Sequence, residues 1–333
     1  MRKLYILGMI LGMYATFSAC NDEWKDELYT QMLSFKAPLG DNGLSEIYVR
    51  YQPDGTGIYQ LPVIVSGSKS NSRNIDAKIA VDEDTLRILN QEKFPVGRQD
   101  LWYVPLAEQH YSFESNICHI PAGENIQLYP IHFNFNGLEK YVLPLTIEED
   151  PSYVQNKYKG RYKALLGVNL FNDYSGTYNT TLMNIYIEGT TTDPAKVDTR
   201  LARVVDENTI FFYAGSTWVE DENRSRYKVF VEFEEGTEDE EGTIKGKLRL
   251  YGDEGEPGIN IRPLGECKYE KRIIQHETIK YMERHLTTLE LSYKYTDVTS
   301  NPDYPITYEV KGSMTMERQI NPLIPDEDQA IEW

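Results

Sequence analysis

Aromatic side chains set among polar ones are the residues of this chain best suited to chemistry. Residues 213–224 place a tryptophan beside a turn signal between two strand patterns, with acidic, amide and guanidinium groups around it. A sugar ring stacks its C–H face on Trp or Tyr, and its hydroxyls bond to such polar groups in a shallow site. The candidate glycan-binding residues in this stretch are Tyr213, Trp218, Glu220, Asn223 and Arg224. A tryptophan that covers the end of a β-sheet fits the same pattern, so this alternative stays open.

A second aromatic pair, Trp102 and Tyr103, lies in residues 94–111. This pair is the other candidate for stacking on a sugar. Leu101 and Val104 flank it, and apolar neighbours on both sides favour packing into a core over contact with a ligand. The sequence therefore offers two possible binding loops.

Signatures of catalysis are missing from the sequence. There is no Gly-x-Ser-x-Gly elbow, and the five histidines show no i, i+4 pair for a metal. Among 52 acidic residues some pair lies close by chance, but the alternating βαβ pattern of a catalytic barrel is absent. The acidic run 234–242 could attract Ca²⁺, but it lacks the spacing of a calcium loop, and a solvated cluster fits it better. We therefore predict no enzyme activity, no metal site and no cofactor.

The first twenty residues predict export and lipid attachment. Two basic residues precede an apolar run at 4–17, and small residues then lead to Cys20. The run is short for a membrane span, which needs about 20 apolar residues, and the pattern is that of a bacterial lipoprotein signal cut before Cys20. We expect a signal peptide at 1–19, a lipid on the Cys20 thiol and a polar tether at 20–36. An ordinary thiol beside a simple cleaved signal is the alternative.

The composition is acidic and typical of a folded chain. The chain has 52 acidic and 34 basic residues, a formal net charge of −18. Such a charge repels phosphate backbones, so nucleic acid is not an expected partner. The 25 tyrosines favour strands and also suit surfaces that face carbohydrate. A disulfide between Cys118 and Cys267 would have to join two predicted domains, so two buried thiols are expected.

Short alternating strand patterns separated by turn signals run through the chain. Residues 47–51 and 59–65 flank the turn 52–57 and together predict a hairpin. Residues 83–90 predict a short helix capped by Asp82. Further strand patterns continue to residue 316, and residues 321–333, with two prolines and several acids, are expected to run over the surface.

The length favours two domains, which we place at 37–170 and 171–333. Repeated short strands in both halves predict an all-β fold. The first domain is expected to be an antiparallel β-sandwich, and the second a further β-sandwich or a flattened β-barrel.

Three motifs in the first domain carry a resemblance to a known family. They are Ala-Lys-Ile-Ala-Val-Asp-Glu-Asp at 77–84, His-Ile-Pro-Ala-Gly-Glu at 119–124 and Tyr-Val-Leu-Pro-Leu-Thr-Ile at 141–147. Residues 35–170 resemble the Ig-like N-terminal domain of Bacteroidetes surface lipoproteins and of some family 18 endo-glycosidases. Residues 171–178 resemble the start of the companion domain that often follows it. The resemblance implies an Ig-like sandwich without agreed catalytic residues.

The same resemblance implies a location and partners. Members of this family commonly occur in glycan-utilisation systems, beside outer-membrane transporters of the starch-utilisation type. The acidic residues directly after Cys20 resemble the surface-export signal of Bacteroidetes outer-membrane lipoproteins. We therefore expect a non-catalytic lipoprotein, exposed at the cell surface and held to the outer membrane by its lipid alone, that binds an oligosaccharide or polysaccharide for such a transporter complex. The alternative is a structural or adhesive surface subunit that binds a protein partner.

Overall fold

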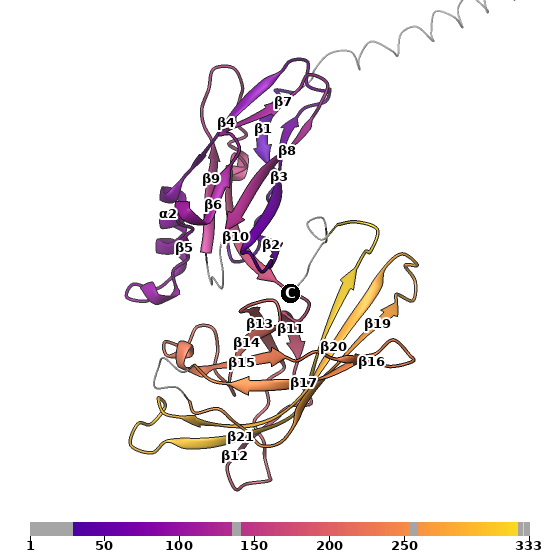
Figure 1. Cartoon of the computed structure of the whole chain (residues 1–333). Coiled ribbons are helices and arrows are strands. Elements are labelled where there is room, and N and C mark those ends of the chain that lie inside the picture. Colours follow the sequence, from indigo (N-terminus) through magenta and orange to yellow (C-terminus); the bar gives the residue numbers. More distant parts are fainter. Residues whose placement is uncertain (1–28, 135–140, 254–258, 326–328, 330–333) are drawn as a thin grey trace, which may run out of the picture.

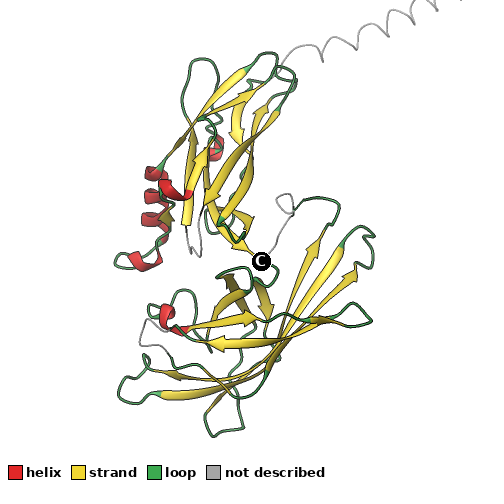
Figure 2. Cartoon of the chain, viewed as in Figure 1, coloured by secondary structure: helices red, strands yellow, loops and turns green. Residues whose placement is uncertain are grey.

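The computed structural model describes residues 29–134, 141–253, 259–325 and 329. The predicted signal peptide, Cys20 and the first part of the predicted tether lie outside the described residues. The fold is all-β, as predicted, with short helices at the margins of the sheets (Figures 1 and 2). Within the described ranges, no helix is long and apolar enough to cross a membrane.

Two curled sheets form the first domain. The first sheet has the order β1-β3-β8-β6 with every pair antiparallel. Its strands are β1 (Met32–Phe35), β3 (Thr56–Ser66), β8 (Ile126–Asn134) and β6 (Tyr111–Phe113). Strand β1 falls in the segment that the sequence assigns to a tether, yet Leu33 and Phe35 are buried in the core. The folded part of the chain thus begins earlier than predicted.

The second sheet of this domain faces the first across a common core. Its order is β2-β10-β9-β4-β7, with β5 beside β9. The pairs β2–β10 and β5–β9 are parallel, and the other pairs are antiparallel. The strands are β2 (Ser45–Arg50), β10 (Lys163–Phe171), β9 (Tyr141–Ile147), β4 (Ile75–Val81), β7 (Ile117–Ile120) and β5 (Val104–Pro105).

The hairpin predicted around residues 52–57 is wrong, although the turn itself forms. Strand β2 pairs with β10, whereas β3 pairs with β1 and β8 in the other sheet. The turn therefore carries the chain between sheets, and the two strands pass so closely that a Cβ at Gly57 would lie 2.4 Å from Val49 Cγ1. A period of two indicates which side chains share a face, but it does not say which strand pairs with which.

The predicted helix is confirmed as α2 (Glu83–Lys93), which runs one turn longer than expected. The Asp82 side chain caps it by accepting a hydrogen bond from the Thr85 backbone N–H at 3.3 Å. Four short 3-10 helices also form: η1 (Gln99–Leu101), η2 (Glu108–His110), η3 (Tyr158–Gly160) and η4 (Arg224–Tyr227). Helices α2, η1 and η2 lie together along one side of the first domain (Figure 2).

Eight strands close into a barrel in the second domain, one of the two architectures predicted for it. Strand β21 closes the barrel because it pairs with both β11 and β20. In spatial order the barrel strands are β11 (Gly176–Asn179), β13 (Thr199–Val204), β14 (Thr209–Tyr213), β15 (Lys228–Phe233), β17 (Ile244–Tyr251), β19 (Cys267–Gln275), β20 (Glu283–Asp297) and β21 (Ile306–Ile320). Three shorter strands pair with β21, β17 and β20 respectively: β12 (Asn184–Ile187), β16 (Thr237–Glu238) and β18 (Arg262–Pro263).

Tyrosines fill much of the barrel core. Those buried there are Tyr178, Tyr227, Tyr269, Tyr293 and Tyr295. Buried hydroxyls need hydrogen-bond partners, and two of them find backbone carbonyls: Tyr178 donates to the carbonyl of Tyr174 at 2.7 Å, and Tyr269 donates to that of Glu234 at 2.9 Å. The tyrosine enrichment therefore serves packing to a large extent. Cys118 and Cys267 are free, buried thiols, as predicted.

Candidate binding cleft at the domain junction

The two predicted binding loops meet at the junction of the domains. Arg98 of the first domain donates through Nη2 to the backbone carbonyl of Glu220, 2.6 Å away. In return, Arg224 donates through Nη2 to the backbone carbonyl of Asp100 at 3.2 Å. We call these four residues the clasp. It brings together two loops that the sequence presented as separate candidates.

Paired charges reinforce the clasp. Arg98 contacts the Asp100 carboxylate twice, at 2.9 Å from Nε and 3.0 Å from Nη2. Nη1 of Arg224 lies 3.6 Å from the same carboxylate. Hydrogen bonding to Arg98 lowers the pKa of Asp100, and hydrogen bonding to Asp100 raises the pKa of Arg98. Asp100 is exposed and the two arginines are partly exposed, so solvent weakens these ion pairs and the clasp orients the loops more than it stabilises the fold.

A second charged contact ties the domains together through the linker. Asp173 accepts from Nη1 of Arg50 at 2.9 Å in the first domain and from Nζ of Lys271 at 2.7 Å in the barrel. Burial alone would raise the pKa of Asp173, but attraction to Lys271 and Arg50 outweighs it, and the pKa is lowered. The carboxylate therefore stays ionised between two cations and fixes the start of the second domain.

A cleft of about 330 Å³ opens beside the clasp and is lined by both domains. This volume lies at the lower end of the range of about 300–1,000 Å³ that is usual for small-molecule sites. Two of the predicted residues, Tyr103 and Glu220, line it. Most of the other lining residues were not predicted from the sequence. They belong in large part to β2, the end of α2, β9, β10 and β13.

Aromatic rings form one part of the cleft wall. Tyr103 is fixed by Asn90, whose side-chain amide accepts from the Tyr103 backbone N–H and donates to its carbonyl, both at 2.9 Å. The Tyr103 ring packs edge-to-face on Phe94 at a centroid distance of 5.4 Å, and Lys93 Nζ lies 5.6 Å from the Tyr103 centroid. Burial, and then the charge of Glu46, raise the pKa of the Tyr103 hydroxyl. The ring is thus a neutral, preorganised surface.

Hydrogen-bonding groups form another part of the wall. The Glu46 carboxylate accepts from the side-chain amides of Asn42 and Asn169. Gly167 leaves the space that this carboxylate occupies, because a Cβ there would lie 2.6 Å from Glu46 Oε2. Arg203 of β13 also lines the cleft. Carboxylate, amide and guanidinium groups beside aromatic rings are the set that binds sugar hydroxyls and stacks on sugar rings.

The remaining predicted residues lie outside the cleft lining. Tyr213 is only 8% exposed and packs edge-to-face against the Phe211 ring at a centroid distance of 6.0 Å. Trp218 is 54% exposed, with the Arg200 guanidinium 5.6 Å from its ring centroid. Asn223 is exposed before η4, and Trp102 is half-buried after η1.

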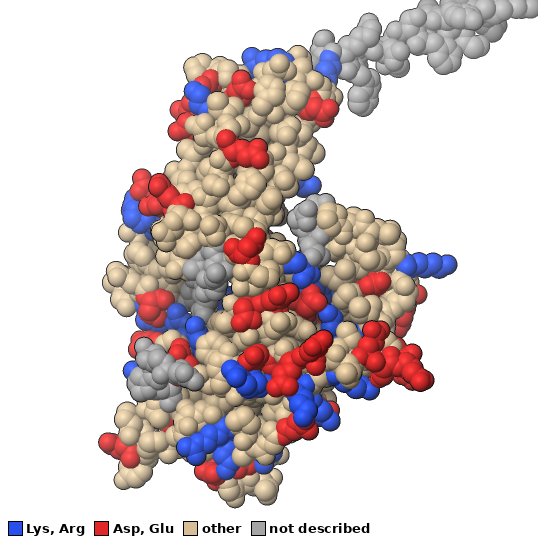
Figure 3. All heavy atoms as spheres, viewed as in Figure 1, with Lys and Arg blue, Asp and Glu red and all other residues tan. Residues whose placement is uncertain are grey.

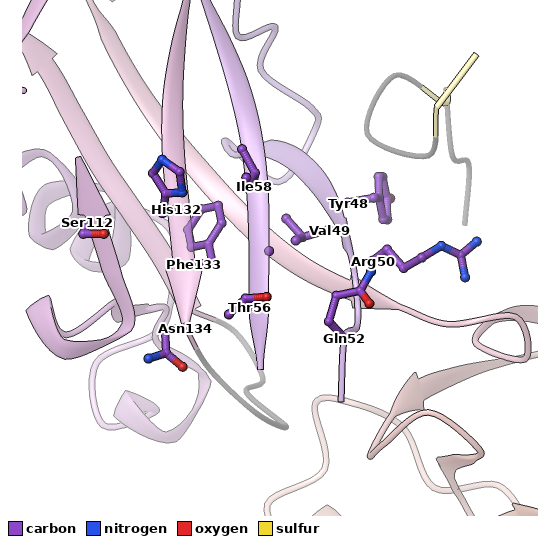
Figure 4. A pocket seen from close by; sticks show the side chains of 11 residues that line it. Tyr48, Val49, Arg50, Gln52, Thr56, Ile58, Ser112, His132, Phe133 and Asn134 are labelled. Atoms are coloured by element: carbon purple, nitrogen blue, oxygen red, sulfur yellow. The ribbon is translucent and has the colours of Figure 1, made fainter. Parts of the chain in front are cut away.

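A larger hollow of about 650 Å³ lies within the first domain, between β2 and the β3–β8 pair (Figure 4). Figure 4 shows residues that line it, among them Tyr48 and Arg50 on β2 and His132 and Asn134 on β8. Arg50 is already engaged by Asp173, and Tyr48 is the hollow's one aromatic ring outside the core. We favour the smaller cleft because it offers more rings and more hydrogen-bonding groups.

Metal-binding groups do not gather in the described part of the chain, where no cluster of three His, Cys, Asp or Glu could hold an ion. In the acidic turn, Asp239 accepts from Lys245 Nζ at 2.9 Å and from the Thr243 backbone N–H at 3.0 Å. The Asp239 carboxylate is therefore already bound by residues of its own hairpin.

Comparisons with known proteins match each half of the chain to the model of a known domain family. Residues 24–151 match the model of a domain of unknown function, DUF4973, and residues 162–315 match the model of a C-terminal domain. A search of curated proteins gave no match.

Several solved structures match nearly the whole chain. A multidomain protein including DUF1735 from Bacteroides ovatus is 40% identical, with 91% of this chain and 100% of that chain covered and a TM-score of 0.77. An auxiliary nutrient binding protein from Bacteroides thetaiotaomicron is 29% identical, with 90% and 100% covered and a TM-score of 0.74. The identity to the first structure extends through both domains. The chain therefore belongs to the family of two-domain Bacteroides proteins that this structure represents, in which a DUF4973 domain precedes a second β domain.

Proposed function

We propose that this protein is a non-catalytic glycan-binding protein whose cleft at the domain junction holds an oligosaccharide or a segment of polysaccharide. The observation that carries the proposal is the presence, in one cleft, of the Tyr103 ring, which packs on Phe94, and the hydrogen-bonded Glu46–Asn169 pair. A relative with the same two domains is named an auxiliary nutrient binding protein, which supports a binding role.

Affinity gels test this proposal. The full chain is run through gels that contain host or fungal glycans, such as mucin glycans and yeast mannan, beside a known binder of each. We expect retention of the wild type, weaker retention of Tyr103→Ala, and unchanged retention of Tyr281→Ala, an exposed tyrosine on the barrel. No retention in any gel that retains the known binder contradicts glycan binding.

The proposed location is the outer face of the outer membrane, with a lipid on Cys20. It is supported by the lipoprotein pattern at the N-terminus and by the surface-export resemblance of the residues after Cys20. There the protein would hold glycan for a transporter complex of the starch-utilisation type. Labelled palmitate tests the anchor: we expect it in the wild type and in Cys118→Ser but not in Cys20→Ser. Equal labelling of Cys20→Ser contradicts attachment at this cysteine.

One observation favours a protein partner as a second candidate function. The outer face of the β3–β8 pair carries apolar residues in register, with Ile64 opposite Ile126 and Pro62 opposite Leu128. Ile126 is 53% exposed and Leu128 48%. Figure 3 shows a face of the molecule on which the first domain carries few charged side chains. An exposed apolar sheet face is a common feature of protein interfaces.

Chemical cross-linking in cells separates the two functions. If the apolar face binds a protein, Leu128→Asp abolishes a cross-linked species that wild type gives and leaves glycan retention unchanged. If the protein acts through the cleft alone, Leu128→Asp changes neither readout.

A further inference from the structure

Arg200 is a charged side chain inside the barrel. In β13 the alternate residues Arg200, Ala202 and Val204 are buried, and Arg200 is only 9% exposed. Across the ladder it stands opposite Tyr178 of β11, which is fully buried. The guanidinium therefore lies at the inner wall of the barrel rather than at its surface.

The described residues form no ion pair with Arg200 and act on its charge only from a distance. Its Nη2 is buried without a hydrogen-bond partner in this part of the chain. Trp218 covers the guanidinium with its ring at 5.6 Å, which attracts the cation but does not neutralise it. Asp221 also acts on Arg200 electrostatically, but no described hydrogen bond joins the two, and Asp221 Oδ2 accepts from the Trp218 backbone N–H at 2.7 Å. A buried ion without a partner is costly, so this position calls for an anion.

A cavity beside Arg200 sets the size of that anion. It has a volume of about 20 Å³ and is lined by Arg200, Thr180, Gly215, Tyr293 and apolar side chains of the barrel. A cavity needs about 10–15 Å³ to hold one water molecule, so this one admits a single particle of that size and excludes a sugar carboxylate or a sulfate. A water molecule would accept a hydrogen bond from Nη2 but would not compensate the charge of the guanidinium. A monatomic anion would do both.

We propose that Arg200 and this cavity form a binding site for a small monovalent anion of the halide class. The anion accepts a hydrogen bond from Nη2 and pairs with the guanidinium beneath Trp218. It thereby fixes the start of the loop that carries Gly215 and Trp218 against the barrel, next to the Glu220 side of the cleft.

Thermal unfolding of the full-length protein tests the site. Solutions of sodium chloride, bromide and gluconate are compared at equal ionic strength, so that general screening is the same. We expect Tm to be higher in chloride and bromide than in gluconate by at least about 2 °C, rising to a plateau with halide concentration. Arg200→Met should lose this difference. Arg249→Met, which removes an exposed arginine paired with Glu232, should keep it.

Crystals of the wild type soaked in bromide provide a test that does not depend on the folding of the variant. We expect an anomalous bromide peak within hydrogen-bond distance of Arg200 Nη2. Equal Tm values of the wild type in all three salts overturn the proposal, as does a bromide-soaked crystal that shows only water in the cavity.

Discussion

Arg98 donates a hydrogen bond to the backbone carbonyl of Glu220 at 2.6 Å, across 122 residues of sequence. This contact and its counterpart from Arg224 to Asp100 join the two loops that border the cleft. The geometry of the proposed site therefore depends on contacts between domains. Substitutions that loosen the junction should weaken binding without unfolding either domain.

Arg98→Ala tests this dependence. The variant loses the bond to Glu220 and both contacts to Asp100, so the loops are no longer held in their binding arrangement. We expect glycan affinity to fall by about threefold to tenfold, equivalent to about 0.6–1.4 kcal/mol. The free energy of unfolding should change by less than about 1 kcal/mol, because Arg98 and Asp100 are both partly exposed to solvent. Calorimetric titration with a glycan retained in the gels measures the first quantity, and urea unfolding the second.

Arg87→Ala is the matched control for this experiment. Arg87 is an exposed arginine on α2 that pairs with Asp84 at 2.8 Å, away from the junction. We expect it to leave affinity unchanged. Equal losses in both variants would contradict a specific role of the clasp.

Gly167→Ala addresses the polar wall of the cleft. A Cβ at this position would lie 2.6 Å from Glu46 Oε2, so the carboxylate must move and its bond from Asn169 must weaken. We expect affinity to fall several-fold while the fold persists, because a flexible side chain can shift. Gly265→Ala is the control, since nothing lies within 4 Å of its Cβ position. An unchanged affinity of Gly167→Ala in calorimetric titration would remove Glu46 from the site.

Asp173 makes stability depend on pH. Its pKa is lowered in the folded state, so its ionised form favours folding above the unfolded value of about 3.9, and this contribution is lost as the pH falls toward the folded value. Its side chain is 47% exposed, so solvent screening keeps the effect of Asp173→Asn at about 1 kcal/mol at pH 7. We expect the difference in unfolding free energy between wild type and variant to shrink below about pH 4. A difference that stays constant from pH 7 to pH 3 in urea unfolding is the contrary outcome.

Gly215 at the mouth of the barrel permits close packing against Tyr295. Its φ is +57°, and a Cβ there would lie 1.7 Å from the Tyr295 hydroxyl oxygen. Gly189 also has a positive φ, +81°, but open space around its Cβ position. Gly189→Ala should therefore cost only about 1 kcal/mol for the backbone, whereas Gly215→Ala should cost about 1–3 kcal/mol more for overpacking. Urea unfolding compares the two, and equal costs would show that Tyr295 gives way freely.

Local patterns in the sequence predicted much of the fold. Alternation of side chains predicted the strands, and the cap at Asp82 predicted the helix that follows it. Both signals are properties of neighbouring residues. The predicted hairpin that ends at Gly57 does not form, since the pairing of its two strands depends on other strands far away in the chain. The sequence left a sandwich and a barrel open for the second domain, because closure depends on β21 pairing with both β11 and β20.

The candidate site was predictable only in part. Tyr103 and Glu220 could be predicted because each is an aromatic or polar residue in one of the two candidate loops. Glu46 and Asn169 did not, because they lie 123 residues apart in strands whose parallel pairing no local pattern reveals. Tyr213 was predicted to bind glycan but is buried in the barrel wall. Tyrosine suits both a sugar-facing surface and a buried barrel wall, and only burial in the structure distinguishes them.

A crystal structure of the protein with an oligosaccharide retained in the affinity gels tests the proposed cleft most directly. We expect the sugar between the two domains, with a ring against Tyr103 and hydroxyls within hydrogen-bond distance of Glu46 and Asn169. A sugar bound instead in the hollow beside His132, or stacked on Trp218 with the cleft empty, contradicts the proposed site.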